Sequence, residues 1–261
     1  MIATDKNLHS NHSSGVRGII PLSEGSFTID KTKIFVPFNL ETDDLQQRPI
    51  GSLLVEVQPF VIVTDNDIYL IDTGLGFSVN GQLQIHANLI SKGIQPNQIT
   101  KVLMSHLHKD HAGGICLRDS LGNCQLAFPN AKYYVQKKEF EFAMETGSPS
   151  FITEEISVLE NNPQVIWLDG DGVIDGFITH QTTSAHSPLH QVFWFKKDGE
   201  ILFFGGDDAP QLQQMKNKFV AKYDFDGKKC MQLRQQWWEE SQANDWTFLF
   251  YHDIKTPIYP V

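Results

Sequence analysis

The stretch that decides the fold of this chain reads Ser105-His106-Leu107-His108-Lys109-Asp110-His111-Ala112-Gly113-Gly114. Three imidazoles and one carboxylate fall within positions 106 to 111, directly after a strand-like apolar run. His106 and His108 project from the same side of an extended segment, because side chains alternate along a strand. Asp110 and His111 follow where two glycines allow the chain to turn, so they are placed to serve a second ion. The pattern predicts a site for two metal ions, against the alternative of a solvated loop between strand and helix.

Further donors occur where other apolar runs end. Each ion needs a third protein donor beside an open position for water. His186 follows a short polar segment, Asp207 follows the run 201–206, and His252 follows the run 246–251. Upstream, Asp72 follows the run 67–71 and precedes Thr73-Gly74. The segments before Asp72, Asp207 and His252 have the layout of a buried strand that delivers one polar residue to a loop.

The order of these elements resembles the metallo-β-lactamase superfamily. That family's pattern is an Asp-Thr-Gly after a strand, His-x-His-x-Asp-His, a further His, an Asp after Gly, and a late His. The match spans residues 68 to 252. The resemblance implies an α/β fold, a four-layer αβ/βα sandwich of two packed mixed sheets flanked by helices. We expect one hydrolase domain at residues 17–261, preceded by a flexible N-terminal arm at residues 1–16.

The resemblance also assigns roles to individual residues. His106, His108 and His186 would hold the first metal, Asp110, His111 and His252 the second, and Asp207 would bridge the two. Asp72 would orient a motif histidine through its ring N–H, as metal-bound imidazoles generally require. His190 is interpreted as a residue behind the ligands or one that faces the substrate. Asp208 competes with Asp207 for the bridging role, and only the Gly206-Asp207 adjacency favours Asp207. Substitution of Asp208 is therefore expected to be mild.

This ligand set predicts hydrolysis. Two divalent ions activate a bridging water at neutral pH and polarise a substrate oxygen, so the hydroxide attacks a lactone or other ester-type substrate. Asp110 is a candidate for proton transfer to the leaving group. Imidazole and carboxylate ligands favour zinc, and iron, manganese or cobalt fit the same set. Two alternatives stay open: a phosphotriester or thioester hydrolase of the same fold, and a non-catalytic metal-containing sensor of a small molecule.

Within the superfamily, the chain resembles the branch of N-acyl-homoserine-lactone lactonases and methyl parathion hydrolase. The local matches are the Ser105–His108 segment and Tyr251-His252-Asp253. One residue departs from the lactonase pattern, because Pro210 stands where well-known lactonases have a tyrosine that hydrogen-bonds the lactone carbonyl. Seven aromatic residues are candidates for an apolar substrate wall, although most such residues lie in cores; they are Phe38, Phe77, Phe140, Phe142, Phe151, Trp237 and Trp238.

Composition limits the partners. The chain has 21 Lys and Arg against 31 Asp and Glu, a formal net charge of −10, which argues against nucleic acid and against polyanionic substrates. No apolar run has transmembrane length, so we expect a cytoplasmic enzyme with a small-molecule substrate and no membrane partner. A homodimer is an open alternative to a monomer. Cys116, Cys124 and Cys230 are odd in number and are expected to be reduced structural thiols.

Alternating apolar residues and turn signals predict the secondary structure. Strands are expected at residues 33–36, 52–58, 60–64, 67–71, 101–104, 131–135, 164–168, 173–179, 191–197, 201–204 and 247–251. Helices are expected at residues 82–92, 137–145, 153–160, 211–219 and 227–242.

Overall fold

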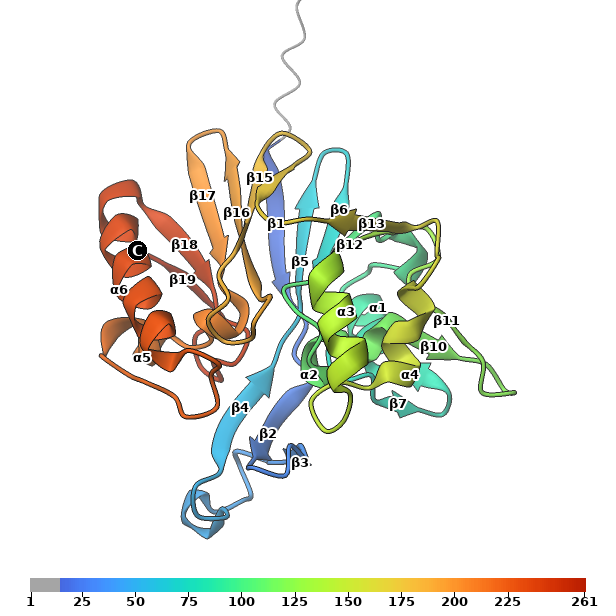
Figure 1. Ribbon diagram of the computed structural model, residues 1–261, viewed down its shortest axis with the longest axis horizontal. Helices are drawn as coiled ribbons and strands as arrows, with labels where there is room; N and C mark the ends of the chain where they lie inside the picture. Colours follow the sequence, from blue (N-terminus) through green and yellow to red (C-terminus); the bar gives the residue numbers. More distant parts are fainter. Residues whose placement is uncertain (1–14) are drawn as a thin grey trace, which may run out of the picture.

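Two six-stranded sheets pack face to face in the computed structural model, which describes residues 15–261 (Figure 1). The first sheet has the strand order β1-β5-β6-β9-β12-β13. Its strands are β1 (Val16–Pro21), β5 (Phe60–Thr64), β6 (Ile68–Ile71), β9 (Lys101–Leu103), β12 (Lys132–Gln136) and β13 (Val165–Leu168). The second sheet follows chain order and comprises β14 (Gly172–Ile174), β15 (Ile178–Thr182), β16 (Gln191–Lys197), β17 (Glu200–Phe204), β18 (Trp246–Leu249) and β19 (Ile258–Pro260).

Helices cover the outer face of each sheet, which makes four layers (Figure 1). The helices are α1 (Gln84–Ser91), α2 (Lys109–Ala112), α3 (Lys137–Thr146), α4 (Thr153–Ile156), α5 (Leu212–Lys216) and α6 (Gly227–Asn244). Helices α1, α3 and α4 pack on the first sheet, and α5 and α6 pack on the second. The expected sandwich of two helix-flanked sheets is therefore observed. Among the described residues, no helix combines the length and apolar character needed to cross a membrane.

The core shows why these strands pack on both faces. In β5, Phe60 and Ile62 belong to the cluster between the sheets, whereas Val61 belongs to the cluster under the helices. In β16, Phe193 faces the other sheet and Trp194 faces α6. Because side chains alternate along a strand, a continuous apolar run can fill two core layers at once. The central strands of both sheets are therefore buried on both faces, and polar functional groups are found at the sheet edges.

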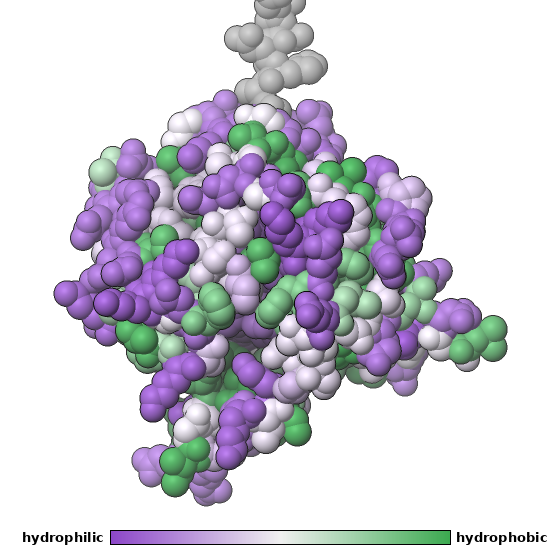
Figure 2. All heavy atoms as spheres, in the orientation of Figure 1, coloured by the Kyte–Doolittle hydropathy of each residue, from purple (hydrophilic) through white to green (hydrophobic). Residues whose placement is uncertain are grey.

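A smaller three-stranded sheet projects from the body of the sandwich (Figure 1). It consists of β2 (Gly25–Ile29), β3 (Val36–Pro37) and β4 (Leu53–Val57). Two hairpins complete the strands: β7 (Ser78–Val79) with β8 (Gln82–Leu83), and β10 (Cys116–Arg118) with β11 (Cys124–Leu126). Figure 2 shows hydrophobic surface on the projecting part, where Ile34, Ile50 and Leu53 are exposed. We call the β2-β3-β4 sheet and its connections, residues 25–57, the projecting sheet.

The expected N-terminal arm at 1–16 lies outside the described residues except for its last two, so it stays a prediction, and Val16 begins β1. One expectation about local structure is wrong. The expected strand at 173–179 is a hairpin of β14 and β15, because Asp175 and Gly176 both take positive φ angles that turn the chain.

The cysteines also differ from expectation. Cys116 and Cys124 form a disulfide across the β10-β11 hairpin, and Cys230 is free and buried. The sequence does not predict strands at 116–126, so it gives no indication that the two sulfurs lie close together. The expectation of reduced thiols therefore holds only for Cys230.

Candidate metal centre

Seven side chains that the sequence singled out converge at one edge of the two sheets. His106, His108, His186 and Asp207 form one group of potential ligand atoms, and Asp110, His111 and His252 form a second group. Within each group the donor atoms lie within 4.8 Å of one another. The two groups contain the residues that the resemblance assigns to the two metals, with Asp207 in the first group. We call the seven residues the donor cluster.

Strand ends deliver these residues to one place. Strands β6 and β9 run parallel in the first sheet, and β17 and β18 run parallel in the second. The segments after β9, β17 and β18 carry the 106–111 motif, Asp207 and His252. Because carboxyl ends of parallel strands meet at one edge of a sheet, two such edges facing each other gather residues that are far apart in sequence. His186 comes from the loop between β15 and β16.

The two glycines of the motif are required for space. Gly113 has an ordinary helical φ of −61°, so the turn itself does not need glycine there. A Cβ atom on Gly114 would overlap the carbonyl oxygen of Thr73, and one on Gly113 would overlap that of Leu75. The loop after β6 therefore packs directly against the backbone of Gly113 and Gly114, which have no side chains. In return, Thr73 N–H and Oγ1 both donate hydrogen bonds to the carbonyl of His111, which ties the two segments together.

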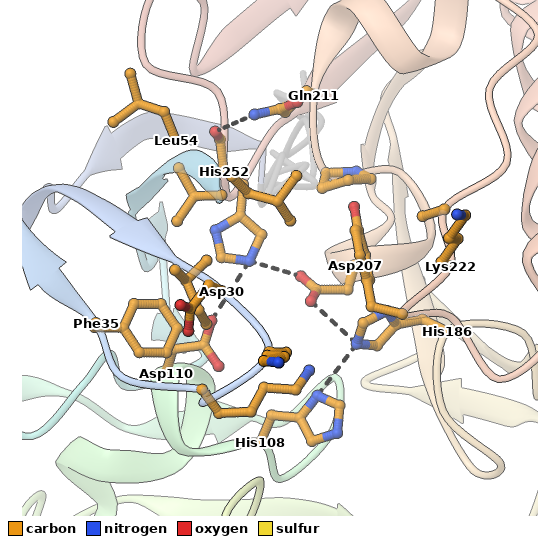
Figure 3. Close-up of a pocket in the computed structure, with 18 of the residues that line it drawn as sticks. Asp30, Phe35, Leu54, His108, Asp110, His186, Asp207, Gln211, Lys222 and His252 are labelled. Atoms are coloured by element: carbon orange, nitrogen blue, oxygen red, sulfur yellow. Dashed lines mark hydrogen bonds and ion pairs between the residues drawn. The ribbon is translucent and has the colours of Figure 1, made fainter. Parts of the chain in front are cut away.

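Asp207 lies between the two groups. Its Oδ1 atom is 3.0 Å from His111 Nε2 and 2.9 Å from His252 Nε2, and its Oδ2 atom is 3.1 Å from His186 Nε2. Figure 3 shows its carboxylate pointing into the space between His252 and His186. One carboxylate oxygen thus faces each group, which is the geometry a bridging ligand needs.

The donor atoms fit metal ions better than they fit one another. His108 Nδ1 lies 2.9 Å from His106 Nε2 and 3.1 Å from His186 Nε2, so three ring nitrogens face a common point. His111 Nε2 and Asp207 Oδ1 are buried and lack an aligned hydrogen bond despite their 3.0 Å separation. Buried polar atoms left without partners call for an explanation. Nitrogen and oxygen donors that converge in this way suit divalent zinc or a similar ion.

In several of the histidines, the Nδ1 atom of the ring makes a hydrogen bond that holds the imidazole in place. Asp72, which is fully buried, accepts a hydrogen bond from His111 Nδ1 at 2.7 Å and from Ser105 Oγ at 2.7 Å. Ser105 Oγ in turn contacts His106 Nδ1 at 3.0 Å. His252 Nδ1 donates to the backbone carbonyl of Glu56 at 2.6 Å. Such contacts fix the tautomer and orientation of a ring whose other nitrogen binds metal.

Sequence reasoning did not single out Asp224 as an individual residue. Its Oδ1 atom lies 2.8 Å from His186 Nδ1, and its side chain is 1% exposed. Asp224 therefore contacts the Nδ1 atom of His186 in the same way that Asp72 contacts the Nδ1 atom of His111. Its position in an Asp-rich stretch before α6 was the only signal, and Asp226 shares that stretch, so the sequence does not distinguish the two.

His190 and Asp208 lie behind the donor cluster. His190 is fully buried, accepts the N–H of Asp207 at its Nε2, and places Nδ1 3.0 Å from Asp208 Oδ2. Complete burial leaves no room for the substrate-facing interpretation. Asp208 is also fully buried and accepts the backbone N–H of His186 at 2.7 Å. The expected mildness of an Asp208 substitution conflicts with this position, because removal would leave buried donors unsatisfied.

The two groups differ in charge when no metal is bound. Burial lowers the pKa of His106 and His108 well below the ordinary value, and neighbouring imidazoles lower it further, so both rings are neutral and ready to bind. For His111, burial opposes protonation, but Asp207 and Asp110 outweigh it and raise the pKa well above the ordinary value. A metal ion entering the second group must therefore displace a proton, and its affinity rises with pH.

A pocket of about 800 Å³ opens over the donor cluster. His108, Asp110, His186, Asp207 and His252 form its floor. Its apolar wall comes from the projecting sheet, with Phe35, Leu54 and Val55, and from the segment between α5 and α6, with Phe219 and Val220. Phe35 and Leu54 are labelled in Figure 3. None of the seven aromatic residues proposed from sequence lines it; Phe140, Phe151 and Trp237 are buried in the core. Pro210 does line the pocket.

The sequence model of the metallo-beta-lactamase superfamily matches residues 55–207. The chain belongs to this superfamily. Both the family and the fold that the sequence motifs predicted are confirmed.

Several relatives are similar to this chain. The N-acyl homoserine lactonase AttM of Azorhizobium caulinodans is 30% identical over 125 residues, which is 44% of this chain and 44% of that protein. A probable metal-dependent hydrolase from Staphylococcus aureus superimposes with a TM-score of 0.75 at 22% identity, over 93% of this chain and 91% of that one. AidC, a dizinc quorum-quenching lactonase solved with a product, superimposes with a TM-score of 0.69 at 18% identity, over 92% and 88% of the two chains.

Proposed function

We propose that this protein is a dinuclear metal-dependent hydrolase of a lactone or other ester-type substrate. The observation that carries the proposal is the position of Asp207, whose two oxygens face the two groups of donors at 2.9 to 3.1 Å. His106, His108 and His186 would hold one ion, Asp110, His111 and His252 the other, and Asp207 both. Zinc is the ion we propose, with iron, manganese and cobalt as alternatives.

When bound, the two ions would supply an activated water at neutral pH and polarise a substrate oxygen. The chain's own residues prepare the site for this chemistry. Asp72 and Asp224 hold the rings of His111 and His186, so that the Nε2 atoms keep their direction. Asp110 Oδ2 lies 3.5 Å from His252 Nε2 at the floor of the pocket, where it can pass a proton to the leaving oxygen.

The pocket supports an ester-type substrate with an apolar portion. Its wall is built by aliphatic and aromatic side chains on two separate segments, and the polar groups are gathered at the floor. A volume of about 800 Å³ lies in the range of small-molecule sites. The similarity to AttM and AidC favours a lactone as the first substrate to test. A phosphotriester is the second, because two metal ions can also direct an activated water to a phosphoryl centre.

Metal content and turnover together test the proposal. After zinc reconstitution, elemental analysis should give two ions per chain, and N-hexanoyl-homoserine lactone should be hydrolysed with release of one proton per turnover. Thioesters and phosphotriesters are assayed alongside. One ion or fewer per chain would contradict the dinuclear proposal. Two ions with no turnover of any of these substrates, together with tight binding of an unchanged ligand, would favour the sensor instead.

A further inference from the structure

The pocket mouth carries a local charge that differs from that of the chain. Although the net charge is −10, four lysines line the pocket; they are Lys31, Lys33, Lys109 and Lys222. Apart from the donor cluster, Asp30 is the only acidic residue among the lining residues. Its Oδ1 atom already accepts hydrogen bonds from the backbone and side chain of Thr32. The mouth is therefore cationic in an acidic protein.

Two of these lysines lie beside the donor cluster. Lys109 is the first residue of α2, between His108 and Asp110, and its N–H donates to the carbonyl of Ser150. Lys33 lies in the turn between β2 and β3, and both lysines are partly buried. Lys33 has a φ angle of 60°, a left-handed conformation that glycine or asparagine adopts more easily. The turn alone gives no reason for a lysine at this position.

The two lysines line the same pocket from separate segments, Lys33 on the projecting sheet and Lys109 next to the floor residues His108 and Asp110. Within residues 15–261, none of the four lining lysines has an ion pair or a side-chain hydrogen bond. Cations that line one pocket without an ion-pair partner form a site that an anion stabilises.

We propose that Lys33 and Lys109 form a subsite for an anionic group of the substrate. The inference rests on the proposed hydrolase function and narrows its substrate class. The substrate is a lactone or ester whose apolar chain lies along Phe35, Leu54 and Val55 and which carries a carboxylate or phosphate beside the His108 side of the floor. Each lysine acts as a mobile point charge, which recognises such a group without a rigid bidentate geometry.

The test compares substrates that differ only in the end of their acyl chain. Homoserine lactones bearing a hexanoyl chain, an adipoyl chain ending in carboxylate, and a 6-phosphooxyhexanoyl chain are assayed on zinc-loaded protein. We expect kcat/KM to be about tenfold higher for at least one anionic lactone than for the hexanoyl lactone. Which of the two is preferred separates carboxylate from phosphate. The preference should fall in 0.5 M salt, because the lysines are partly exposed.

Lysine variants test whether the preference for anionic lactones depends on Lys33 and Lys109. In the double variant Lys33→Met with Lys109→Met, the ratio of anionic to neutral kcat/KM should fall to about one. Lys218→Met is the matched control, because Lys218 is exposed on the segment next to the pocket and does not line it. The control should keep the wild-type ratio. A preference that survives in the double variant would show that the anion binds elsewhere, for example at the metals, and would overturn the inference.

Failure of the proposed function is distinguishable from failure of the subsite. If the wild type hydrolyses none of the three lactones, the hydrolase proposal fails for this class, and the intact lactones serve as ligands in calorimetry. Tighter binding of an anionic lactone, lost in the double variant, would then still support the subsite. Equal binding of the three, or tighter binding of the hexanoyl compound, would overturn it.

Discussion

The floor and the mouth of the pocket differ in how deeply their side chains are buried and in how they are held. At and behind the floor, His111, His186 and His190 are buried, and each ring is held by a carboxylate. At the mouth, Lys31 and Lys222 are exposed, and neither has an ion pair within residues 15–261. The mouth is lined by the projecting sheet and by the segment between α5 and α6, which are far apart in sequence.

We infer from this contrast that the floor determines the metal chemistry and the mouth determines the choice of substrate. A metal centre needs ligand directions held within narrow limits, which buried hydrogen bonds to the imidazoles provide. Substrate choice needs a surface that can vary without disturbing the ligands, and loops on a rigid scaffold provide that. We therefore expect substitutions at the floor to act on metal and turnover, and substitutions at the mouth to act on the ratio between substrates.

The strongest test of the contrast is Asp207→Ala. Loss of the carboxylate between the two groups should reduce kcat/KM by at least about a thousandfold and lower the metal content below two ions per chain. The comparison variant is Asp30→Asn at the mouth, which preserves the turn and should change kcat/KM less than about threefold. Elemental analysis and lactone kinetics measure both. An Asp207→Ala protein that keeps two ions and most of its activity would remove the bridging role.

A smaller effect is expected behind the floor, at Asp224. Asp224→Asn keeps the shape of the side chain but weakens the acceptor for His186 Nδ1, so metal affinity or kcat/KM should fall about 10- to 100-fold. Asp226→Asn is the control, because Asp226 accepts the N–H of Lys229 at the start of α6 and asparagine caps helices equally well. Competition with a chelator gives the affinities. Equal loss in the two variants would indicate a general disturbance of this loop.

The next prediction concerns the stability of the fold and the buried carboxylate of Asp208. Burial raises its pKa, but the charge and hydrogen bond of His190 outweigh burial and lower the pKa from 3.8 to about 2. A carboxylate with a lowered pKa in the folded state stabilises the fold above its unfolded pKa and loses that contribution as pH falls toward 2. The shift corresponds to about 2 kcal/mol. Asp208→Asn should therefore destabilise metal-free protein by about that amount at pH 6.

Denaturant unfolding at a series of pH values checks this expectation. The difference in free energy of unfolding between wild type and Asp208→Asn should be constant from pH 6 to about pH 4 and shrink below pH 4. A difference that does not change with pH would assign the loss to packing or to hydrogen bonds rather than to the carboxylate charge.

The smallest effect is expected at the mouth, at Pro210. Its backbone carbonyl accepts the N–H of His252, and tyrosine keeps that carbonyl while adding a hydroxyl beside the floor. Pro210→Tyr should raise kcat/KM for N-hexanoyl-homoserine lactone by about tenfold, since one hydrogen bond to the lactone carbonyl is worth roughly 1–3 kcal/mol. Pro210→Phe supplies the ring without the hydroxyl and should give no gain. Equal rates for the two variants would show that the hydroxyl does not reach the substrate.

Much of the fold and the donor set could be read from the sequence. The spacing of the 106–111 motif predicted a metal site, and the resemblance to the metallo-β-lactamase superfamily assigned His186, Asp207 and His252 to it; the structure brings all seven side chains together. The strands at 60–64 and 191–197 were predicted at their observed bounds, because uninterrupted apolar and β-branched runs are typical of strands buried on both faces. The motif spacing and the apolar runs are local features, so the order of residues along the chain contains them.

The remaining features arise only when distant segments meet. Asp224 stands behind His186 across 38 positions, and Glu56 lies behind His252 across 196. The cationic mouth forms because the β2-β3 turn and the first residue of α2 line the same pocket, and no run of basic residues marks it in a chain of net charge −10. The sequence by itself determined which atoms can bind metal, since donor type and spacing are local properties. Only the tertiary structure decided how those atoms are held and what charge the substrate meets, because hydrogen bonds and electrostatic fields depend on distance in space and not on distance along the chain.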